Sequence, residues 1–123
     1  MRDTRPKNLN LFTIRFPLPA IVSILHRISG FFLFLLIPFV LWAFSYSLTT
    51  YGFEALQQWL SNTTVKCILW VVFVPFCYHL IAGIRHLLAD IHLGDSLKSG
   101  RAGALLTLVL SVVIVIFAGI WLW

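Results

Sequence analysis

The chain has 123 residues, which is the length of a single domain. Sixty per cent of the residues are hydrophobic and only 11% are charged, whereas soluble domains carry about 25% charged residues. This composition excludes an ordinary soluble enzyme, a disordered tail and a nucleic-acid binder. The net charge of +5 does not indicate nucleic acid, because the nine Lys and Arg residues lie between long apolar runs. We interpret them as membrane-topology signals.

Three uncharged stretches of the chain are long enough to cross a membrane. They are residues 28–47, 67–84 and 102–123. About 20 apolar residues span the ~30 Å hydrocarbon core as a helix, and a helix satisfies its own backbone groups there. The sequence therefore predicts an all-α integral membrane protein with a single transmembrane domain over residues 1–123. Its membrane helices are expected near 21–48, 65–91 and 102–123.

The first of these helices is expected to begin near Ala20, because Pro17 and Pro19 disfavour a helix just before it. The first apolar run starts late, is too long for a signal peptide and lacks a small-residue cleavage site. We therefore expect it to remain in the mature protein as an anchor. A buried soluble bundle, the alternative, needs far more polar surface than this chain has.

The connection after the first helix contains a segment with helical periodicity, residues 52–61. Its apolar residues are Phe53, Leu56, Trp59 and Leu60, with Glu54, Gln57 and Gln58 between them. This pattern predicts a short amphipathic helix that lies on the membrane surface.

The distribution of Lys and Arg predicts the orientation of the chain. The N-terminal segment and the second connection are the basic parts of the sequence, with Arg2, Arg5, Lys7, Arg15, Lys98 and Arg101. The first connection has only Lys66, and the C-terminal end has no Lys or Arg. We therefore expect the N-terminus and the second connection to be cytoplasmic. The five tryptophans then fall toward the opposite side, as an aromatic belt.

A first polar cluster lies at the cytoplasmic start of the first membrane helix. Ser23 and Arg27 are four residues apart and share a face, and His26 lies beside them. A hydroxyl next to a permanently charged guanidinium provides donors for carbonyl or carboxylate oxygens. The alternative is that Arg27 simply extends its charged end to the interface.

A second polar cluster occupies one face of the second membrane helix: His79, Gly83, His86 and Asp90. His79 lies within the hydrocarbon region, where a neutral imidazole requires a metal or a hydrogen-bond partner. Gly83 leaves a gap beside the backbone that a haem macrocycle would use. The alternative for His79 is a hydrogen-bonded histidine that serves helix packing.

The histidines of this one chain are not placed to bind a haem iron from both sides. His79 and His86 are ~10 Å apart along the helix, so they cannot share an iron. The third helix has no histidine, and His26 is expected to lie too near the cytoplasmic end to oppose His79. If His79 is an axial ligand, the opposite ligand must come from another chain.

At these motifs the sequence resembles the cytochrome b membrane-anchor subunit of succinate dehydrogenase, the succinate:quinone oxidoreductase of respiration. The resemblance covers nearly the whole chain. Three motifs carry it: Arg5-Pro6-Lys7-Asn8-Leu9, Ser23-x-x-His26-Arg27-x-Ser29-Gly30, and His79-x-x-x-Gly83-Ile84-Arg85-His86-x-x-x-Asp90.

The resemblance implies a role for each site residue. Ser23 and Arg27 would line the ubiquinone-reduction site, and His79 would be one axial ligand of haem b, with the other from the partner anchor. His26 and Arg27 would lie near the haem propionates. His86 and Asp90 share the haem-facing side of the second helix nearer to water, where His86 could tune the propionates and Asp90 could relay protons. The alternative for both is an ordinary interfacial polar residue.

The resemblance also implies partners and a location. A second small anchor subunit would complete the haem-binding bundle, and a flavoprotein subunit with FAD and an iron–sulfur subunit would deliver electrons from succinate. The isolated chain is expected to have no catalytic activity of its own. The expected location is a bacterial-type inner membrane, as a multi-pass protein, rather than the mitochondrial inner membrane.

Three other functions remain open on the sequence. A quinol:fumarate reductase anchor would use the same chemistry in reverse. A stand-alone b-type electron carrier is disfavoured, because one chain lacks the second axial ligand. A purely structural anchor without haem would leave His79 as a packing residue.

Overall fold

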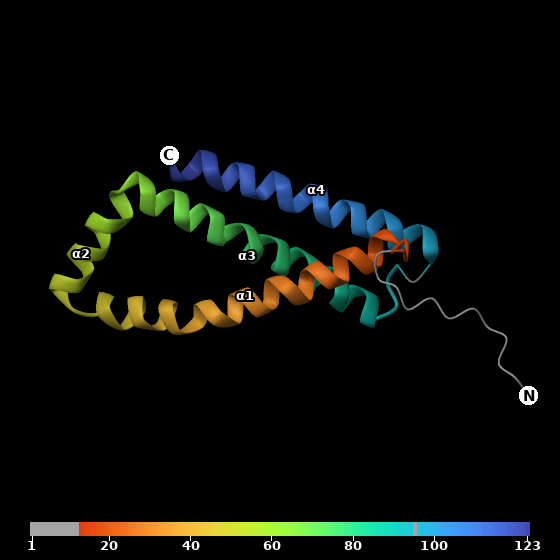
Figure 1. Cartoon of the computed structure of the whole chain (residues 1–123), viewed down its shortest axis with the longest axis horizontal. Helices are drawn as coiled ribbons and strands as arrows, with labels where there is room; N and C mark the ends of the chain where they lie inside the picture. Colours follow the sequence, from red (N-terminus) through yellow and green to blue (C-terminus); the bar gives the residue numbers. More distant parts are fainter. Residues whose placement is uncertain (1–12, 95) are drawn as a thin grey trace, which may run out of the picture.

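The computed structural model describes residues 13–94 and 96–123, and within these ranges it contains helices and short connections without β-strands. Helix α1 spans Leu18–Ser47, α2 spans Thr50–Ser61, α3 spans Thr63–Asp90 and α4 spans Leu97–Leu122. The three long helices run antiparallel in sequence order; α3 lies between α1 and α4 in the half of the molecule near α2 and crosses α1 toward its own C-terminal end (Figure 1). Short α2 closes one end of the molecule. The Arg5–Leu9 motif, and the expected signals at Arg2 and Lys7, lie outside the described residues.

Three helices of the described chain are long and apolar enough to cross a membrane: α1, α3 and α4. They have 30, 28 and 26 residues, which gives each a length of about 40–45 Å. Each therefore exceeds the ~30 Å hydrocarbon core and extends into the interface at its ends. Large apolar side chains cover the outer surface, and among the described residues the fully buried core consists of Val22, Ala82 and Ala104. The predicted all-α architecture with three membrane helices is confirmed.

The helix starts differ from the expected positions for reasons of local chemistry. Helix α1 begins at Leu18 rather than near Ala20, because Pro19 falls in the first turn, where a backbone N–H has no helical partner to lose. Helix α4 begins at Leu97, five residues before the uncharged stretch. The Ser96 side chain caps it by accepting a hydrogen bond from the Ser99 N–H at 3.1 Å. The basic residues of the second connection thus lie partly in the first turn of α4.

Helix α3 contacts both of its neighbours through specific bonds along its length. The Trp70 indole donates to the Val115 carbonyl at 3.0 Å and lies over Gly119, and the Tyr78 hydroxyl donates to the Val22 carbonyl at 2.7 Å. The helix continues through Pro75 without interruption. These bonds fix how α3 is turned toward each neighbour, which in turn determines where its histidines point.

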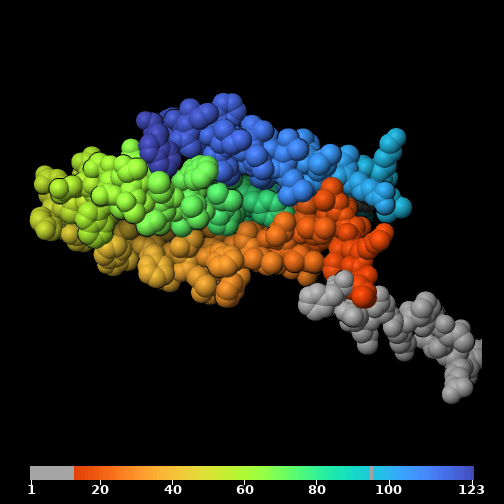
Figure 2. Space-filling model, turned by 45° about the horizontal axis from the view of Figure 1, so that its top comes forward, coloured from red at the N-terminus to blue at the C-terminus, as the bar shows by residue number. Residues whose placement is uncertain are grey.

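The three membrane helices pack most closely at one end. There, Val22 of α1, Ala82 of α3 and Ala104 of α4 meet, and the small size of the two alanines lets the backbones approach. Toward the α2 end, α1 and α4 diverge on either side of α3 (Figure 1). In the space-filling view α3 is visible as a strip between the other two helices (Figure 2). The close-packed end is the end that carries the polar clusters.

Candidate functional site

His79 is held in place by helix α1. Its Nδ1 atom lies 3.1 Å from the backbone carbonyl oxygen of His26 and 3.1 Å from Oγ of Ser29. Ser29 is itself buried, with 5% of its surface exposed, and its hydroxyl donates to the same His26 carbonyl at 2.8 Å. A carbonyl oxygen only accepts hydrogen bonds, so the neutral His79 ring carries its proton on Nδ1. This tautomer leaves the lone pair of Nε2 available as a metal ligand.

The ring of His79 rests on a glycine of the facing helix. A Cβ atom added at Gly30 would lie 2.9 Å from Cε1 of His79, closer than real Cβ contacts. Any larger residue at position 30 would therefore displace the imidazole ring. Gly30 and Ser29 together set the position of His79 in the space between α1 and α3.

His26 enters the same space from α1 and joins two histidines of α3. Its ring is stacked on that of His79, with a centroid distance of 4.1 Å and an interplanar angle of 14°. It is tilted against His86, with a centroid distance of 5.1 Å. On α3, Gly83 makes room for it, since a Cβ atom there would lie 3.3 Å from Nε2 of His26. The two helices therefore exchange histidines, each ring lying against a glycine of the other helix.

This geometry corrects two expectations from the sequence. His26 is not too shallow to meet His79, because α1 and α3 pack so closely here that the two rings lie face to face. The gap at Gly83 is filled by His26 rather than left open for a macrocycle. Two rings stacked directly on one another at 4.1 Å leave no space between them for an iron, so His26 is not the opposing ligand in this arrangement.

Two ring nitrogens in this histidine cluster are buried without a hydrogen-bond partner among the described residues: Nε2 of His26 and Nε2 of His86. Leaving a buried polar group unsatisfied costs about 1–3 kcal/mol. An N–H at either position would serve an anionic group of a ligand that enters the cluster.

The other predicted site residues lie around this cluster. Ser23 is half-buried and Arg27 is exposed on the same face of α1, whereas Asp90 is exposed at the C-terminal end of α3. The structure thus brings together His26, His79 and His86, and leaves Ser23, Arg27 and Asp90 nearer the surface. Sequence reasoning gave no role to Ser29 or Gly30, although both belong to the first-helix motif. The sequence feature that could have identified them is their spacing, because residues three and four positions after His26 lie on the same side of the helix.

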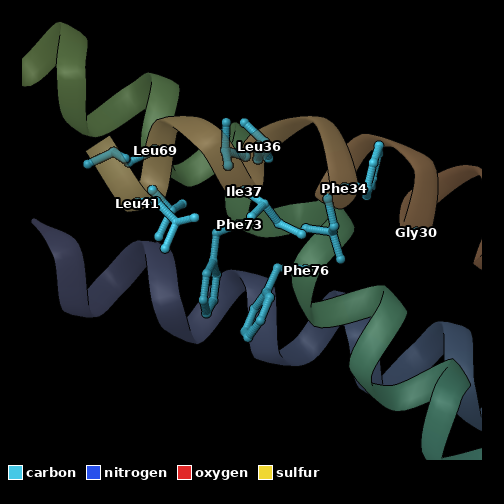
Figure 3. A pocket seen from close by; sticks show the side chains of 11 residues that line it. Gly30, Phe34, Leu36, Ile37, Leu41, Leu69, Phe73 and Phe76 are labelled. Atoms are coloured by element: carbon cyan, nitrogen blue, oxygen red, sulfur yellow. The ribbon is translucent and has the colours of Figure 1, made fainter. Parts of the chain in front are cut away.

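An apolar groove of about 710 Å³ begins at Gly30 and runs between α1 and α3 toward the α2 end. Figure 3 shows side chains of both helices that line it, including Phe34 and Ile37 from α1 and Phe73 and Phe76 from α3. The volume lies within the ~300–1,000 Å³ of ligand sites, and the lining is almost wholly apolar. An apolar surface of this kind suits a flat hydrophobic group or the side chains of another membrane helix.

These residues fit a haem better than a bare metal ion. Within residues 13–94 and 96–123, no three His, Cys, Asp or Glu side chains are grouped to hold a metal ion. A haem supplies four of the iron ligands itself and requires from this chain a single nitrogen with a fixed tautomer, which His79 offers. The apolar groove and the two unpaired buried ring nitrogens match its apolar ring and its acidic side groups.

The fold and the site define a multi-pass helical membrane protein with a histidine cluster between its first two membrane helices. Residues 1–118 match the family model described as the succinate dehydrogenase/fumarate reductase transmembrane subunit. The chain is 38% identical to a succinate dehydrogenase cytochrome b556 subunit of Coxiella burnetii, an alignment that covers 100% of both chains. It is 30% identical to the cytochrome b556 subunit of Paracoccus denitrificans, with 94% of this chain and 89% of the relative covered.

A third relative, the succinate dehydrogenase cytochrome b556 subunit of Rickettsia prowazekii, is 34% identical over 79% of this chain and 76% of its own length. The chain belongs to the family of succinate dehydrogenase/fumarate reductase transmembrane subunits. It is a cytochrome b anchor subunit of succinate dehydrogenase, and its three apolar helices and bacterial relatives place it in the inner membrane as a multi-pass protein.

Proposed function

We propose that this subunit binds haem b through His79 and contributes Ser23 and Arg27 to the site where ubiquinone is reduced. The observation that carries the haem proposal is the pair of contacts at Nδ1 of His79, with the His26 carbonyl and the Ser29 hydroxyl, both at 3.1 Å. They fix the tautomer that an axial ligand needs and orient the ring. When bound, the haem supplies a one-electron carrier close to the quinone site.

The remaining haem contacts follow from the positions of the neighbouring residues. His26 and His86 have buried ring nitrogens that would donate to the propionates, and Arg27 would add a positive charge. The apolar groove that starts at Gly30 would cover part of the ring together with the second small anchor subunit, which would supply the opposing axial ligand.

Ser23 and Arg27 suit the reduction of a quinone carbonyl. The carbonyl oxygen gains negative charge as electrons arrive, and donors aimed at it lower the barrier. Arg27 is permanently cationic, and the Ser23 hydroxyl can donate a hydrogen bond. Protons are needed with the electrons, so a position at the cytoplasmic interface is favourable, and exposed Asp90 would relay them. The electrons would come from succinate by way of the flavoprotein and iron–sulfur subunits.

The axial-ligand assignment predicts that His79→Ala removes most of the low-spin b-type signal. The measurement is a reduced-minus-oxidised spectrum of the purified complex. A matched control is His92→Asn, which removes an exposed imidazole beyond the end of α3 and keeps a side chain that tolerates the positive φ of 62° there. An intact low-spin spectrum in His79→Ala would show that the ligand lies elsewhere and would favour a packing role for this histidine.

The quinone-site assignment predicts that Arg27→Leu lowers quinone-linked turnover about a hundredfold, the usual effect of losing a donor to a developing oxyanion. Succinate oxidation by an artificial dye that accepts electrons upstream should be unaffected. Arg15→Leu, which removes another exposed cation before α1, is the matched control. Equal losses in the quinone and dye assays would instead indicate failed assembly.

The same family description covers fumarate reductases. The relatives carry succinate dehydrogenase names, which favours succinate oxidation as the physiological direction. Comparing the rates of succinate oxidation and quinol-dependent fumarate reduction in the purified complex tests this choice, and a faster fumarate reaction would reverse it.

A further inference from the structure

A second cavity, of about 310 Å³, lies between α3 and α4, and no residue of α1 lines it. The part of its lining toward the connection between the two helices includes Arg85, Gly100 and Gly103, and we call this part its mouth. Neither the histidine cluster nor the Ser23–Arg27 pair takes part in it. We call this cavity the α3–α4 crevice.

The guanidinium of Arg85 lies at the mouth against the backbone of α4. Its Nη2 atom donates to the Gly100 carbonyl at 3.3 Å, and a Cβ atom added at Gly103 would lie 3.4 Å from its Nε atom. Gly103 thus leaves room for the cation beside the helix. A guanidinium has five N–H donors, and the Gly100 carbonyl takes one of them. Donors therefore remain for a ligand in the crevice.

Below its mouth the crevice is lined by apolar side chains. They include Ile81, Ile84 and Leu88 from α3 and Leu106 and Leu110 from α4. Leu110 is seven residues beyond Gly103, which corresponds to ~10 Å along α4. A small anion would not use this depth, whereas a hydrocarbon chain would.

Among the described residues at this end of α3 and α4, cations outnumber acids. Lys98 and Arg101 are both exposed in the first turns of α4. Asp90 follows Arg85 by five residues and so points about 140° away around α3. A neutral amphiphile would leave Arg85 without a charged partner, and the two further cations favour a headgroup with net negative charge.

We propose that the α3–α4 crevice binds an anionic phospholipid, with its phosphate on Arg85 and one acyl chain between α3 and α4. The crevice reaches the connection between these helices, since Leu93 and Gly94 line it, and for helices of this length that end lies at the membrane interface. A cation at the interface above an apolar channel is the arrangement that anionic lipid headgroups recognise.

The test uses the purified complex in nanodiscs of phosphatidylcholine, with or without phosphatidylglycerol, followed by native mass spectrometry of the lipid retained in detergent. The wild-type complex should retain phosphatidylglycerol in preference to phosphatidylcholine. Arg85→Gln should lower this retention about fivefold, the effect of one cation near an anionic surface. Arg101→Gln removes an exposed cation outside the crevice and should lower it much less.

A second variant, Leu106→Trp, keeps Arg85 and fills the apolar channel, so it should also prevent lipid binding. This variant provides the test if Arg85→Gln fails to assemble. Equal retention by the wild type and both crevice variants would overturn the proposal. Equal losses of phosphatidylglycerol in Arg85→Gln and Arg101→Gln would also overturn it, because they would indicate general attraction to the surface. Retention of phosphatidylcholine or quinone in place of phosphatidylglycerol would overturn it as well. The readout is bound lipid, so it is independent of haem and quinone chemistry.

Discussion

At the scale of single residues, the feature that defines the site is the shared carbonyl of His26. This one oxygen lies within hydrogen-bond distance of both the Ser29 hydroxyl and Nδ1 of His79. Ser29 therefore acts on His79 twice, by accepting from Nδ1 and by holding the carbonyl that also accepts from it. A residue that hydrogen-bonds to the ring nitrogen of a histidine ligand on the side away from the metal usually has a strong effect on metal affinity. It does so because it fixes the orientation and the basicity of the ring.

We predict that Ser29→Ala lowers haem retention about tenfold without preventing assembly of the complex. The measurement is the ratio of haem to protein after extended washing in detergent. Ser47→Ala is the matched control, because the Ser47 hydroxyl makes the same type of bond within α1, to the Phe44 carbonyl at 2.6 Å, far from His79. Equal haem ratios in the two variants would mean that Ser29 does not support the ligand.

The residues of the site could be predicted from the sequence only in part. His79, His86 and Asp90 are recognisable because they lie on one face of an apolar helix, where polar groups are costly. The stacking of His26 on His79 could not be predicted, because it depends on the depth at which α1 and α3 cross. That depth is set by contacts such as the Tyr78 hydroxyl on the Val22 carbonyl, which connect residues 56 positions apart.

At the scale of elements, α1 and α3 each contribute a histidine ring that packs against a glycine of the other helix. His79 lies against Gly30, and His26 lies against Gly83. The contact depends on missing Cβ atoms rather than on large apolar side chains. This mode of packing suits a membrane, where close approach of backbones replaces the hydrophobic driving force between helices.

We predict that Gly30→Ala displaces the His79 ring and weakens or shifts the b-type spectrum, because the new Cβ would lie 2.9 Å from Cε1. The reduced-minus-oxidised spectrum and the haem-to-protein ratio are the measurements. Gly100→Ala is the matched control: it is also a helical glycine, and an added Cβ there meets no atom within 4 Å. If both alanine variants keep a wild-type spectrum, the ring does not depend on the glycine gap.

The elements themselves were mostly predictable. Uncharged length alone identifies α1, α3 and α4, and the apolar period of Phe53, Leu56 and Trp59 identifies α2. The starts of α1 and α4 were harder to predict, because they depend on Pro19 in the first turn of α1 and on the Ser96 cap of α4, and not on where charge ends. A helix in a membrane protein continues into the interface, so Lys98 and Arg101 can belong to it.

At the scale of the whole molecule, three antiparallel membrane helices place the two ends of the described chain on opposite sides of the bilayer. The start of α1 lies with the connection between α3 and α4, and the end of α4 lies with α2 (Figure 1). The basic residues Arg15, Lys98 and Arg101 are all at the first of these ends. The positive-inside rule therefore predicts that this end is cytoplasmic.

We predict that alkaline phosphatase fused after Trp123 is active, because this enzyme folds only outside the cytoplasm and the end of α4 should face that side. A fusion after Gly94, which truncates the chain between α3 and α4, is the matched control and should be inactive. The measurement is phosphatase activity normalised to fusion-protein level. The reverse pattern of activity would invert the topology and would move Ser23 and Arg27 away from the cytoplasm.

The tight core of Val22, Ala82 and Ala104 sits at the histidine end, while α1 and α4 separate toward α2. At the far end α4 stays bonded to α3, because Trp70 donates to the Val115 carbonyl and Lys66 donates to the Leu122 carbonyl. A change in bilayer thickness is accommodated by tilt, and here the far end of α1, which diverges from α4, has the most room to tilt. The joined end would move least, so the spacing between His26 and His79 should be insulated from the lipid composition that the far ends experience.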